Sequence, residues 1–274
     1  MGQLHPSGLA EGRPVPDSHG MNPAQVLMLL PDRDFDPTES STPWRLLGAA
    51  GHVVTFATES GEAGVCDQRT LHGEELPLLA GSLCCRPENR SSYQAMERDP
   101  RFQQPMRWVD VDPQAFDALL LPGGHAPGMK PYLESSEVQR IIRAFFSREA
   151  PVGAVCHGVL AAARTRAAQG EHSVLHGLRT TGLTNFQEKV AIGLTRRALG
   201  DHYRTYPETV QDEVSALLAS PSDFLTGGWL PMMGSDAKPD VGFVVRDRHY
   251  VSARFPGDVH RWAATFCGML AEPS

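Results

Sequence analysis

The sequence predicts an α/β fold built on a largely parallel β-sheet. Short apolar runs of strand length alternate with amphipathic stretches of helix length, which is the pattern of successive β-α-β units. Several apolar runs end at Pro or Gly, as buried strands do. A length of 274 residues fits either nearly two domains of ~150 residues or one α/β domain with additions.

The expected strands are short and apolar on both faces, which indicates a sheet covered on both sides. They run from Gln25 to Leu30, from Val53 to Ala57, from Ala118 to Leu121 and from Val152 to Val155, and a hairpin of Val241 to Val245 and His249 to Ala253 follows. Because parallel strands end at the same edge of a sheet, residues that directly follow the first four are expected to meet there.

The expected helices lie between and after these strands. The clearest has an apolar stripe at helical spacing, with Ser135 or Ser136 as its N-cap. The stripe consists of Val138, Ile141, Ile142, Phe145 and Phe146. An earlier helix is expected to start at Thr42-Pro43 and to stop at Gly51. Further helices are expected near Glu74, from Cys156 to about Arg166, from Val210 to Leu218, and from Asp258 onward. Asp258 is expected either to cap the last helix or to approach the site.

Two segments fall outside this pattern. Residues 1–20 are rich in Pro, Gly, Ser and His, so we expect a disordered N-terminal extension. The stretch from Cys85 to Pro113 is polar, and we expect an insertion or flap outside the main sheet. Residues 21–272 are then predicted to form a single α/β domain with that insertion at about 85–113.

The net charge limits the partners that are expected, and the cysteine content indicates the cellular location. The net charge of −7 gives no general attraction for nucleic acid or anionic lipid, so neither is expected as a partner. No apolar run approaches the ~18–20 residues of a membrane span, and no membrane association is expected. The five cysteines are an odd number with no secretion signal, which indicates a reducing, cytoplasmic location.

The most informative motif is Gly153-Ala154-Val155-Cys156-His157-Gly158. A strand that turns abruptly into a helix at a nucleophile forms an elbow, and the small neighbours of Cys156 suit so tight a turn. Backbone N–H groups and the positive end of the helix are then expected to lower the pKa of the thiol. The alternative is that Cys156 is an ordinary buried cysteine.

Two further motifs follow expected strands. Gly123-Gly124-His125 could bring backbone N–H groups to a developing oxyanion, or could be simply a tight turn. Glu39 follows the first strand, where a carboxyl close to the thiol would have a raised pKa and could serve as general acid or base. The alternative for Glu39 is a solvated loop carboxylate. No G-x-G-x-x-G or P-loop occurs.

Together these residues resemble the ThiJ/PfpI superfamily, also called class I glutamine amidotransferase-like. Its central signature is matched by residues 120–125, Leu-Leu-Pro-Gly-Gly-His, and by residues 154–158, Ala-Val-Cys-His-Gly. Glu39, four positions before Pro43, matches its acidic residue. The resemblance implies a flavodoxin-like three-layer sandwich with a mainly parallel sheet, a small insertion and a homodimer. The most similar branch contains heat-shock chaperones and glyoxalase III, which converts methylglyoxal to lactate without glutathione or metal; some members are deglycases.

The resemblance also implies roles for individual residues. Cys156 would add to the aldehyde as a hemithioacetal, Glu39 would move a proton between the two carbons, and His157 would be the acid/base beside the thiol. Glu188, 32 positions after Cys156, is the candidate to orient His157. Gly123, Gly124 and His125 would form the oxyanion and substrate site. No cofactor is implied.

Departures from the family pattern sharpen these expectations. Ala154 stands where glutamine amidotransferases have Gly, and no His-x-Glu follows, so glutaminase activity is not expected. Some members of the branch hold a metal with histidines from the insertion, but residues 85–113 contain no histidine, so no such metal site is expected. Ala126-Pro127 after His125 is expected to reshape the mouth of the pocket.

Three functions remain open at this point. The first is turnover of small reactive carbonyls, with a small molecule as the partner. The second is hydrolysis or hydration of another small electrophile, such as an amide or isocyanide, by the same cysteine. The third is a redox sensor or holdase chaperone without turnover, since an accessible cysteine of low pKa is readily oxidised.

Overall fold

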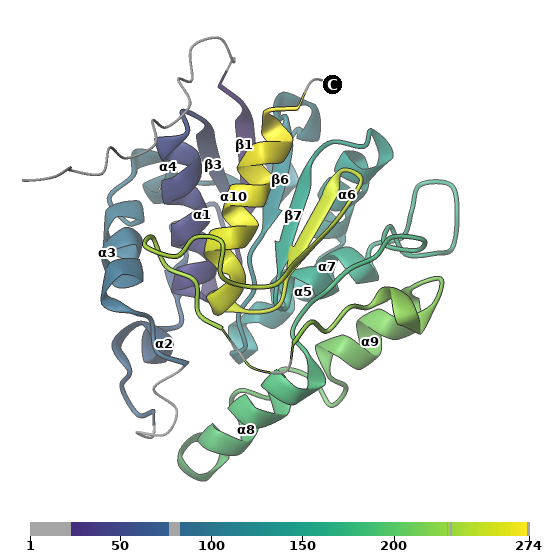
Figure 1. The fold of residues 1–274 in the computed structure, drawn as a ribbon. Coiled ribbons are helices and arrows are strands. Elements are labelled where there is room, and N and C mark those ends of the chain that lie inside the picture. Colours follow the sequence, from purple (N-terminus) through teal and green to yellow (C-terminus); the bar gives the residue numbers. More distant parts are fainter. Residues whose placement is uncertain (1–22, 77–82, 229, 231, 273–274) are drawn as a thin grey trace, which may run out of the picture.

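A seven-stranded sheet forms the centre of the computed structural model, which describes residues 23–76, 83–228, 230 and 232–272 (Figure 1). The expected N-terminal extension, residues 1–20, lies outside these ranges. The strand order is β5-β3-β1-β6-β7-β9-β8. The strands are β1 (Gln25–Leu29), β3 (Val53–Thr58), β5 (Met106–Arg107), β6 (Ala118–Leu121), β7 (Val152–Val155), β8 (Val244–Asp247) and β9 (Tyr250–Ala253).

All neighbouring strands of this sheet run parallel except the β8–β9 hairpin, which is antiparallel. The predicted α/β class with a mainly parallel sheet is therefore confirmed. Strands β6 and β7 are buried along their whole length, as their continuous apolar sequences predict. The carboxyl ends of β1, β6 and β7 lie at one edge, where the candidate site residues follow.

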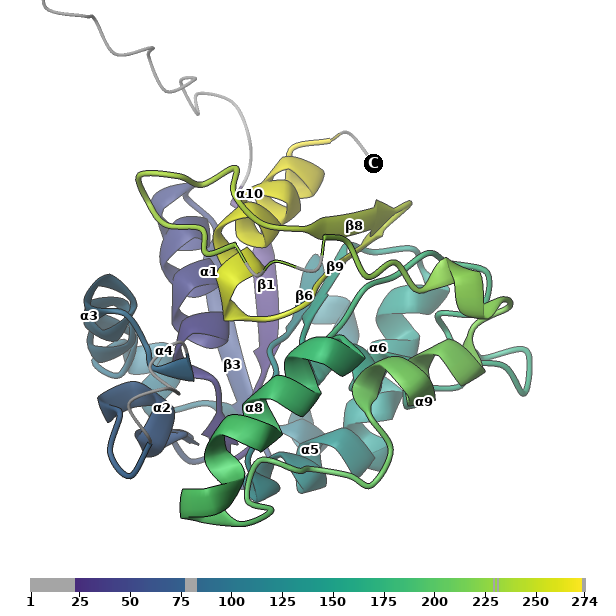
Figure 2. The ribbon, with the colours of Figure 1, turned by 60° about the horizontal axis from the view of Figure 1, so that its bottom comes forward.

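Helices cover both faces of the sheet and give the three layers of a flavodoxin-like fold (Figures 1 and 2). Helices α1 (Pro37–Ala49) and α10 (Val259–Leu270) pack against each other on one face. Helices α5 (Lys130–Glu134), α6 (Ser136–Ser147) and α7 (Gly158–Arg164) pack together on the other. The apolar stripe predicted for α6 is buried, and Ser135 caps this helix.

Helix α1 begins six residues earlier than expected from the sequence, since its N-cap is Asp36 and not Thr42. Asp36 is its N-cap and accepts hydrogen bonds from the backbone N–H groups of Thr38 and Glu39. Pro37 occupies the first turn, where a missing N–H costs nothing. Pro43, taken as a start signal, lies inside the helix. The earlier start places Glu39 in the first helical turn.

The segment from Cys85 to Pro113 is part of the main structure, contrary to its expected place outside the sheet. It forms α3 (Pro87–Met96), α4 (Pro100–Gln103) and the edge strand β5, which pairs with β3. Helix α3 packs against α1. Phe102 of α4 is buried against Phe56 of β3, with ring centroids 5.2 Å apart. The few apolar residues of a polar stretch therefore suffice to dock it.

Several local elements also differ from expectation. Helix α2 (Gln68–His72) ends at Gly73, whose φ is +75°, and so precedes Glu74 rather than including it. Strands β2 (Arg33–Phe35) and β4 (Val65–Cys66) form a second small sheet that was not predicted. Helix α8 (Asn185–Leu199) was also missed, whereas α9 (Val210–Leu217) lies where expected. Figures 1 and 2 show α8 and α9 beyond the carboxyl ends of the strands.

Asp258 precedes α10, but its side chain does not cap that helix. Its carboxyl instead binds the Arg254 guanidinium, with Nε 2.8 Å from Oδ2, and accepts from the backbone N–H of Phe243. Both side chains of the Arg254–Asp258 pair are buried. The pair therefore ties the turn before α10 to the segment before β8.

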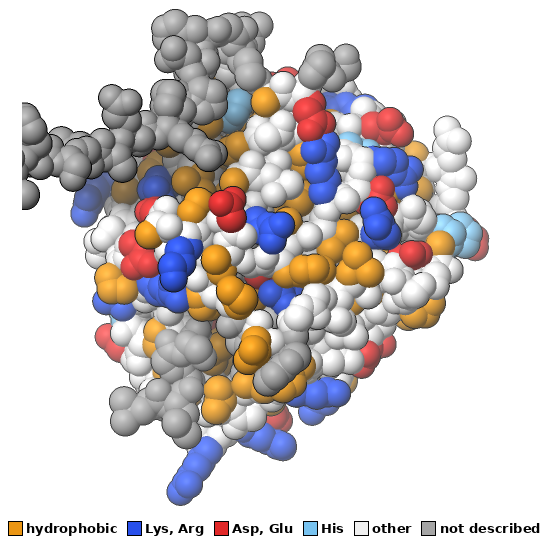
Figure 3. All heavy atoms as spheres, in the orientation of Figure 1, with side chains coloured by type: hydrophobic (Ala, Val, Ile, Leu, Met, Phe, Trp, Pro, Cys, Tyr) orange, Lys and Arg blue, Asp and Glu red, His pale blue; other side chains and the backbone are white. Residues whose placement is uncertain are grey.

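The surface carries mixed charge on the face shown in Figure 3, where basic and acidic side chains are interspersed. Large apolar side chains are exposed at Phe186, Leu230 and Met232. Among the described helices, none combines the length and the apolar character that crossing a bilayer requires.

Candidate active site

Cys156 occupies a strained turn between β7 and α7. Its φ is 56°, in the left-handed region that residues other than glycine rarely adopt. Its backbone N–H donates to the carbonyl of Ala253 in β9. A Cβ at Gly158 would lie 2.0 Å from the carbonyl oxygen of Leu121, so only glycine fits there. The predicted elbow geometry is therefore present in the structure.

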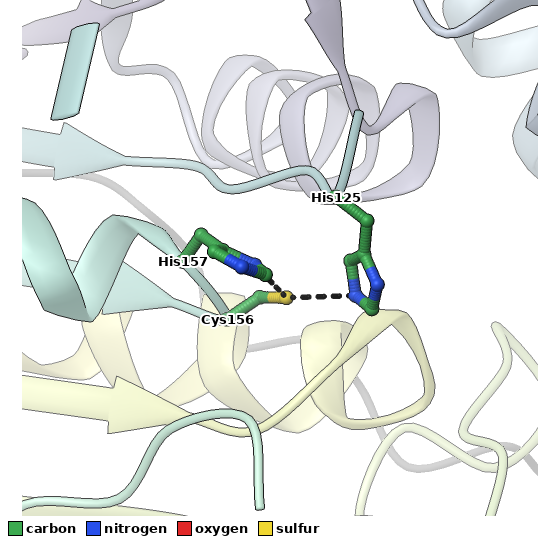
Figure 4. Close-up of side chains that lie close together, drawn as sticks. All are labelled: His125, Cys156 and His157. Carbon is green, nitrogen blue, oxygen red and sulfur yellow. Dashed lines mark hydrogen bonds between the residues drawn. The ribbon is translucent and has the colours of Figure 1, made fainter. Parts of the chain in front are cut away.

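Two imidazoles flank the Cys156 sulfur (Figure 4). His125, in the loop after β6, brings Nε2 to 3.5 Å from Sγ, and His157 brings Nδ1 to 3.6 Å. The two rings lie 5.0 Å apart. The sequence analysis placed His157 beside the thiol but gave His125 only a place in the oxyanion and substrate site.

Glu39 is fully buried at the start of α1. Its Oε2 accepts a hydrogen bond of 2.9 Å from the backbone N–H of Gly123. Among the residues that the structure describes, its Oε1 has no partner in good hydrogen-bond geometry, although the Cys156 thiol lies near enough to lower the pKa of the carboxyl. The Gly123 N–H, assigned to the oxyanion site from sequence, therefore holds Glu39 instead.

Burial dominates the electrostatics of the site. It raises the pKa of Glu39 well above its usual range, and the neighbouring Asp36 raises it further. The pKa of the Cys156 thiol is also raised, first by burial and then by the charge of Glu39, so the expected lowering of the thiol pKa is wrong. The backbone N–H of His157 does lower it, but this effect is outweighed. Desolvation favours the neutral forms of both groups.

Burial also keeps the two histidines neutral. It lowers the pKa of His125 to about 4. Burial, together with the proximity of His125 and Arg164, lowers the pKa of His157 well below its usual value. At neutral pH the sulfur therefore lies between two uncharged imidazoles, each able to accept or donate a proton.

Glu188 acts on this group only through its charge, which adds to the rise in the pKa of the Cys156 thiol. It is buried in the first turn of α8, and its Oε2 accepts a hydrogen bond of 2.9 Å from the backbone N–H of Val210 in α9. Burial raises its pKa to about 7. No hydrogen bond joins Glu188 to His157 among the residues described, so the contact expected for orienting that histidine is not seen.

A pocket opens beside His125 and Gly124. Helix α8 supplies Gln187 and Ala191 to its wall. Three carboxylates also line it, from Asp34, Asp36 and Asp67, together with Arg86 and Tyr203. Cys156 is fully buried and is not part of the wall; it contacts the pocket through His125.

Sequence reasoning missed several of these residues. Asp36 could have been found, since Asp followed by Pro is a helix-start signal. Asp67 and Tyr203, whose hydroxyl donates to Asp67 Oδ2 at 2.8 Å, carry no local signal because 136 positions separate them. The close approach of His125, Cys156 and His157 was also missed: one donor atom from each lies within 4.8 Å of the others, as in metal sites.

Comparisons with known proteins agree with this architecture. A family model described as ThiJ/PfpI family-like matches residues 30–217. Deglycase PfpI of Pyrococcus furiosus is 26% identical over 246 residues, which cover 89% of this chain and 98% of that protein. An uncharacterised protein of Schizosaccharomyces pombe is 26% identical over 120 residues, and this match spans only 43% of that protein.

A solved structure shows the same fold. Glyoxalase III from Candida albicans superposes with a TM-score of 0.64 at 16% sequence identity, over 90% of this chain and 97% of that one. The family model covers more than half of this chain and includes Glu39, Cys156 and His157. The chain therefore belongs to the ThiJ/PfpI-like family.

Proposed function

We propose that this protein is a cysteine-dependent enzyme that acts on small reactive carbonyl compounds, converting methylglyoxal to lactate without glutathione. The observation that supports this proposal best is the left-handed Cys156 elbow, with the His157 imidazole and the buried Glu39 carboxyl beside it. A nucleophile with an adjacent base is the arrangement needed for covalent attack on a carbonyl.

The first step is addition of the thiol to the aldehyde carbon. Because the thiol pKa is raised, Cys156 is protonated before attack, and neutral His157 accepts the proton as the carbon–sulfur bond forms. The carbonyl oxygen takes the electron pair and is protonated to give a hemithioacetal. In this proposal, backbone N–H groups of His157 and Gly124 stabilise the developing oxyanion.

The second step moves hydrogen between the two carbons. Ionised Glu39 removes the proton from C1 of the hemithioacetal, and the electron pair shifts to the ketone oxygen, giving an enediolate. Glu39 returns its proton to C2 while the proton of the C1 hydroxyl moves to the C2 oxygen, which forms the thioester. Water then hydrolyses the thioester to lactate and free Cys156. The raised pKa of Glu39 makes it a stronger base when ionised and a ready proton donor afterwards. No oxidant or reductant is consumed.

Substrate access depends on His125 in this scheme. Its side chain separates the pocket from the fully buried sulfur, so it must turn aside before a carbonyl can reach Cys156. Glu188, which binds the start of α9 rather than His157, is assigned no chemical step and supports the helices around the pocket.

Methylglyoxal turnover tests the proposal. Cys156→Ala is expected to form no lactate above the buffer control, and Glu39→Gln to lose about 100-fold or more in kcat/KM, since general acid–base groups contribute that much. Cys267→Ala, which changes a half-buried cysteine of α10, is the matched control and should retain wild-type rates. Wild-type rates in both active-site variants would refute the mechanism.

A panel of amides, isocyanides and glycated amines tests the alternative substrates in the same assay. If one of these compounds is turned over and methylglyoxal is not, Cys156 remains the proposed nucleophile but the proposed reaction is replaced by the one observed. The sensor hypothesis requires an accessible thiolate. The burial and raised pKa of Cys156 do not support that requirement.

A further inference from the structure

Three side chains around the reactive sulfur have the spacing of metal ligands. The Cys156 Sγ lies 3.5 Å from His125 Nε2 and 3.6 Å from His157 Nδ1, and all three atoms lie within 4.8 Å of one another. His125 comes from the loop after β6 and His157 from the start of α7, so two neighbouring strand ends fix the cluster. Figure 4 shows both rings turned towards the sulfur.

Tetrahedral zinc requires this separation. Bonds of about 2.3 Å to sulfur and about 2.0 Å to nitrogen, at the tetrahedral angle, put the two ligand atoms about 3.5 Å apart. Both observed sulfur–nitrogen distances agree with that value to within about 0.1 Å. The sulfur therefore already lies at zinc-ligand spacing from each imidazole, and the two nitrogens lie within 4.8 Å of each other.

The chemistry of the donors and their surroundings also fits zinc. One thiolate and two imidazoles are ligands that zinc prefers, whereas magnesium and calcium prefer oxygen. Zn²⁺ with one thiolate leaves a net charge of +1, and the carboxyl groups of Glu39 and Asp36 lie near enough to influence Cys156 electrostatically. The pocket reaches one of the three ligands, His125.

We propose that His125, Cys156 and His157 form a zinc-binding site, with the fourth position open to water or an exogenous ligand. Binding breaks the S–H bond of Cys156, forms the Zn–S bond and releases the thiol proton to solvent. Zinc bound there occupies the nucleophile, so it acts as a reversible inhibitor of the proposed carbonyl reaction. The site itself rests on geometry and is tested without substrate, so it stands or falls independently of that reaction.

The test uses the full chain, treated with chelator and then titrated with Zn²⁺. We expect one ion per chain with a Kd below about 1 μM. X-ray absorption at the zinc edge should show one sulfur at about 2.3 Å and two imidazole nitrogens at about 2.0 Å. Co²⁺ in place of Zn²⁺ should give a thiolate-to-cobalt absorption band. Absence of binding, or a coordination shell without sulfur, overturns the proposal.

Variants locate the site. Cys156→Ser and His125→Gln preserve side-chain size and are each expected to weaken zinc binding at least about 100-fold, with the cobalt–thiolate band lost in the serine variant. The matched control is His172→Gln, because His172 and His176 stack on the surface with ring centroids 4.2 Å apart and could hold zinc by themselves. Unchanged binding in Cys156→Ser, or loss of binding in His172→Gln, would place the ion elsewhere.

Discussion

Asp36 and Glu39 place two carboxyl groups at the start of one helix, the first half-buried at the pocket wall and the second fully buried. Asp36 caps α1 through two backbone N–H groups, yet burial raises its pKa to about 6. Glu39 lies in the first turn of the helix, where the charge of Asp36 raises its pKa further, and the charge of Asp67 adds to the rise at Asp36. Both carboxyl groups at the start of α1 therefore stay protonated at pH values at which a solvated carboxyl is ionised.

The ionisation of Asp36 is expected to make the free energy of unfolding depend on pH. Its pKa rises from 3.8 to about 6 on folding, so the folded state binds more protons between these values. Its contribution to the free energy of unfolding therefore falls as pH rises from about 4 to about 6 and stays low above that. Asp36→Asn keeps the cap and cannot ionise. Urea unfolding at pH 8 should show the variant more stable by up to about 3 kcal/mol, and at pH 4 equal to wild type.

A second N-cap provides the control for this experiment. Asp99 caps α4 at a less buried position and accepts from the backbone N–H of Arg101. Asp99→Asn should change the free energy of unfolding by no more than about 0.5 kcal/mol at either pH. If Asp36→Asn also changes the free energy of unfolding by no more than about 0.5 kcal/mol at both pH values, ionisation of Asp36 does not destabilise the protein.

At the residue scale, the sequence identified Cys156, His157 and Glu39 because each lies in a short local motif. It predicted a lowered pKa for the Cys156 thiol, whereas the pKa is raised. The elbow and helix start are local and favour the thiolate, but burial and the charges of Glu39 and Asp36 depend on the assembled fold. The contact between His125 and Cys156 was missed for the same reason, since 31 positions separate them.

At the scale of elements, the turn from β7 into α7 depends on one close approach. A Cβ at Gly158 would lie 2.0 Å from the Leu121 carbonyl oxygen, a backbone atom of β6 that cannot move without disturbing the sheet. Gly158→Ala is therefore expected to lower the free energy of unfolding by about 3 kcal/mol or more. Denaturant unfolding monitored by circular dichroism measures this loss.

Gly48 supplies the opposite case for comparison. It lies in the last turns of α1, and a Cβ there would meet nothing within 4 Å. Gly48→Ala should stabilise the protein by up to about 1 kcal/mol, because alanine is the better helix former. Equal effects of the two substitutions would show that the β7–α7 turn tolerates a side chain.

The apolar strands could be predicted because burial on both faces of the sheet leaves a continuous apolar run. The helix α6 could be predicted because burial of one face leaves an apolar stripe at helical spacing. The start of α1 was placed too late, because Pro43 resembles a first-turn proline whereas Asp36 and Pro37 supply the actual cap. Strand β5 has only two residues and pairs with β3 at the sheet edge, so its short sequence carries no period to detect. Helix α8 has a weak apolar face, with only Ala191 of its apolar residues buried.

At the scale of the whole molecule, the pocket is assembled from distant segments. Tyr203, after α8, donates its hydroxyl to Asp67, the N-cap of α2, and packs edge-on to His125 with ring centroids 6.3 Å apart. This buried hydrogen bond connects the segment after α8 to the opposite wall of the pocket. No stretch of sequence contains the pocket, so sequence analysis could locate the nucleophile but not the shape of the space that leads to it.

Removing the Tyr203 hydroxyl tests whether its hydrogen bond to Asp67 stabilises the pocket. Tyr203→Phe leaves the buried Asp67 carboxyl short of one partner and is expected to destabilise the fold by about 2 kcal/mol. If the proposed reaction takes place in this pocket, KM should rise more than kcat falls. Tyr206→Phe, which removes a surface hydrogen bond to Glu134, is the control and should cost less than about 0.5 kcal/mol. An effect on kcat alone would place Tyr203 in the chemistry rather than in the wall.

The expected single domain, homodimer and cytoplasmic location stay predictions.

The pairing of β7 with β9 has a consequence for biosynthesis. Cys156 lies at the end of β7, and the strand that accepts its backbone N–H begins at Tyr250, which is made 94 residues later. Before β9 is translated, neither this hydrogen bond nor the pairing along that side of β7 can form. Completion of the sheet around Cys156 therefore depends on the last part of the chain to be made.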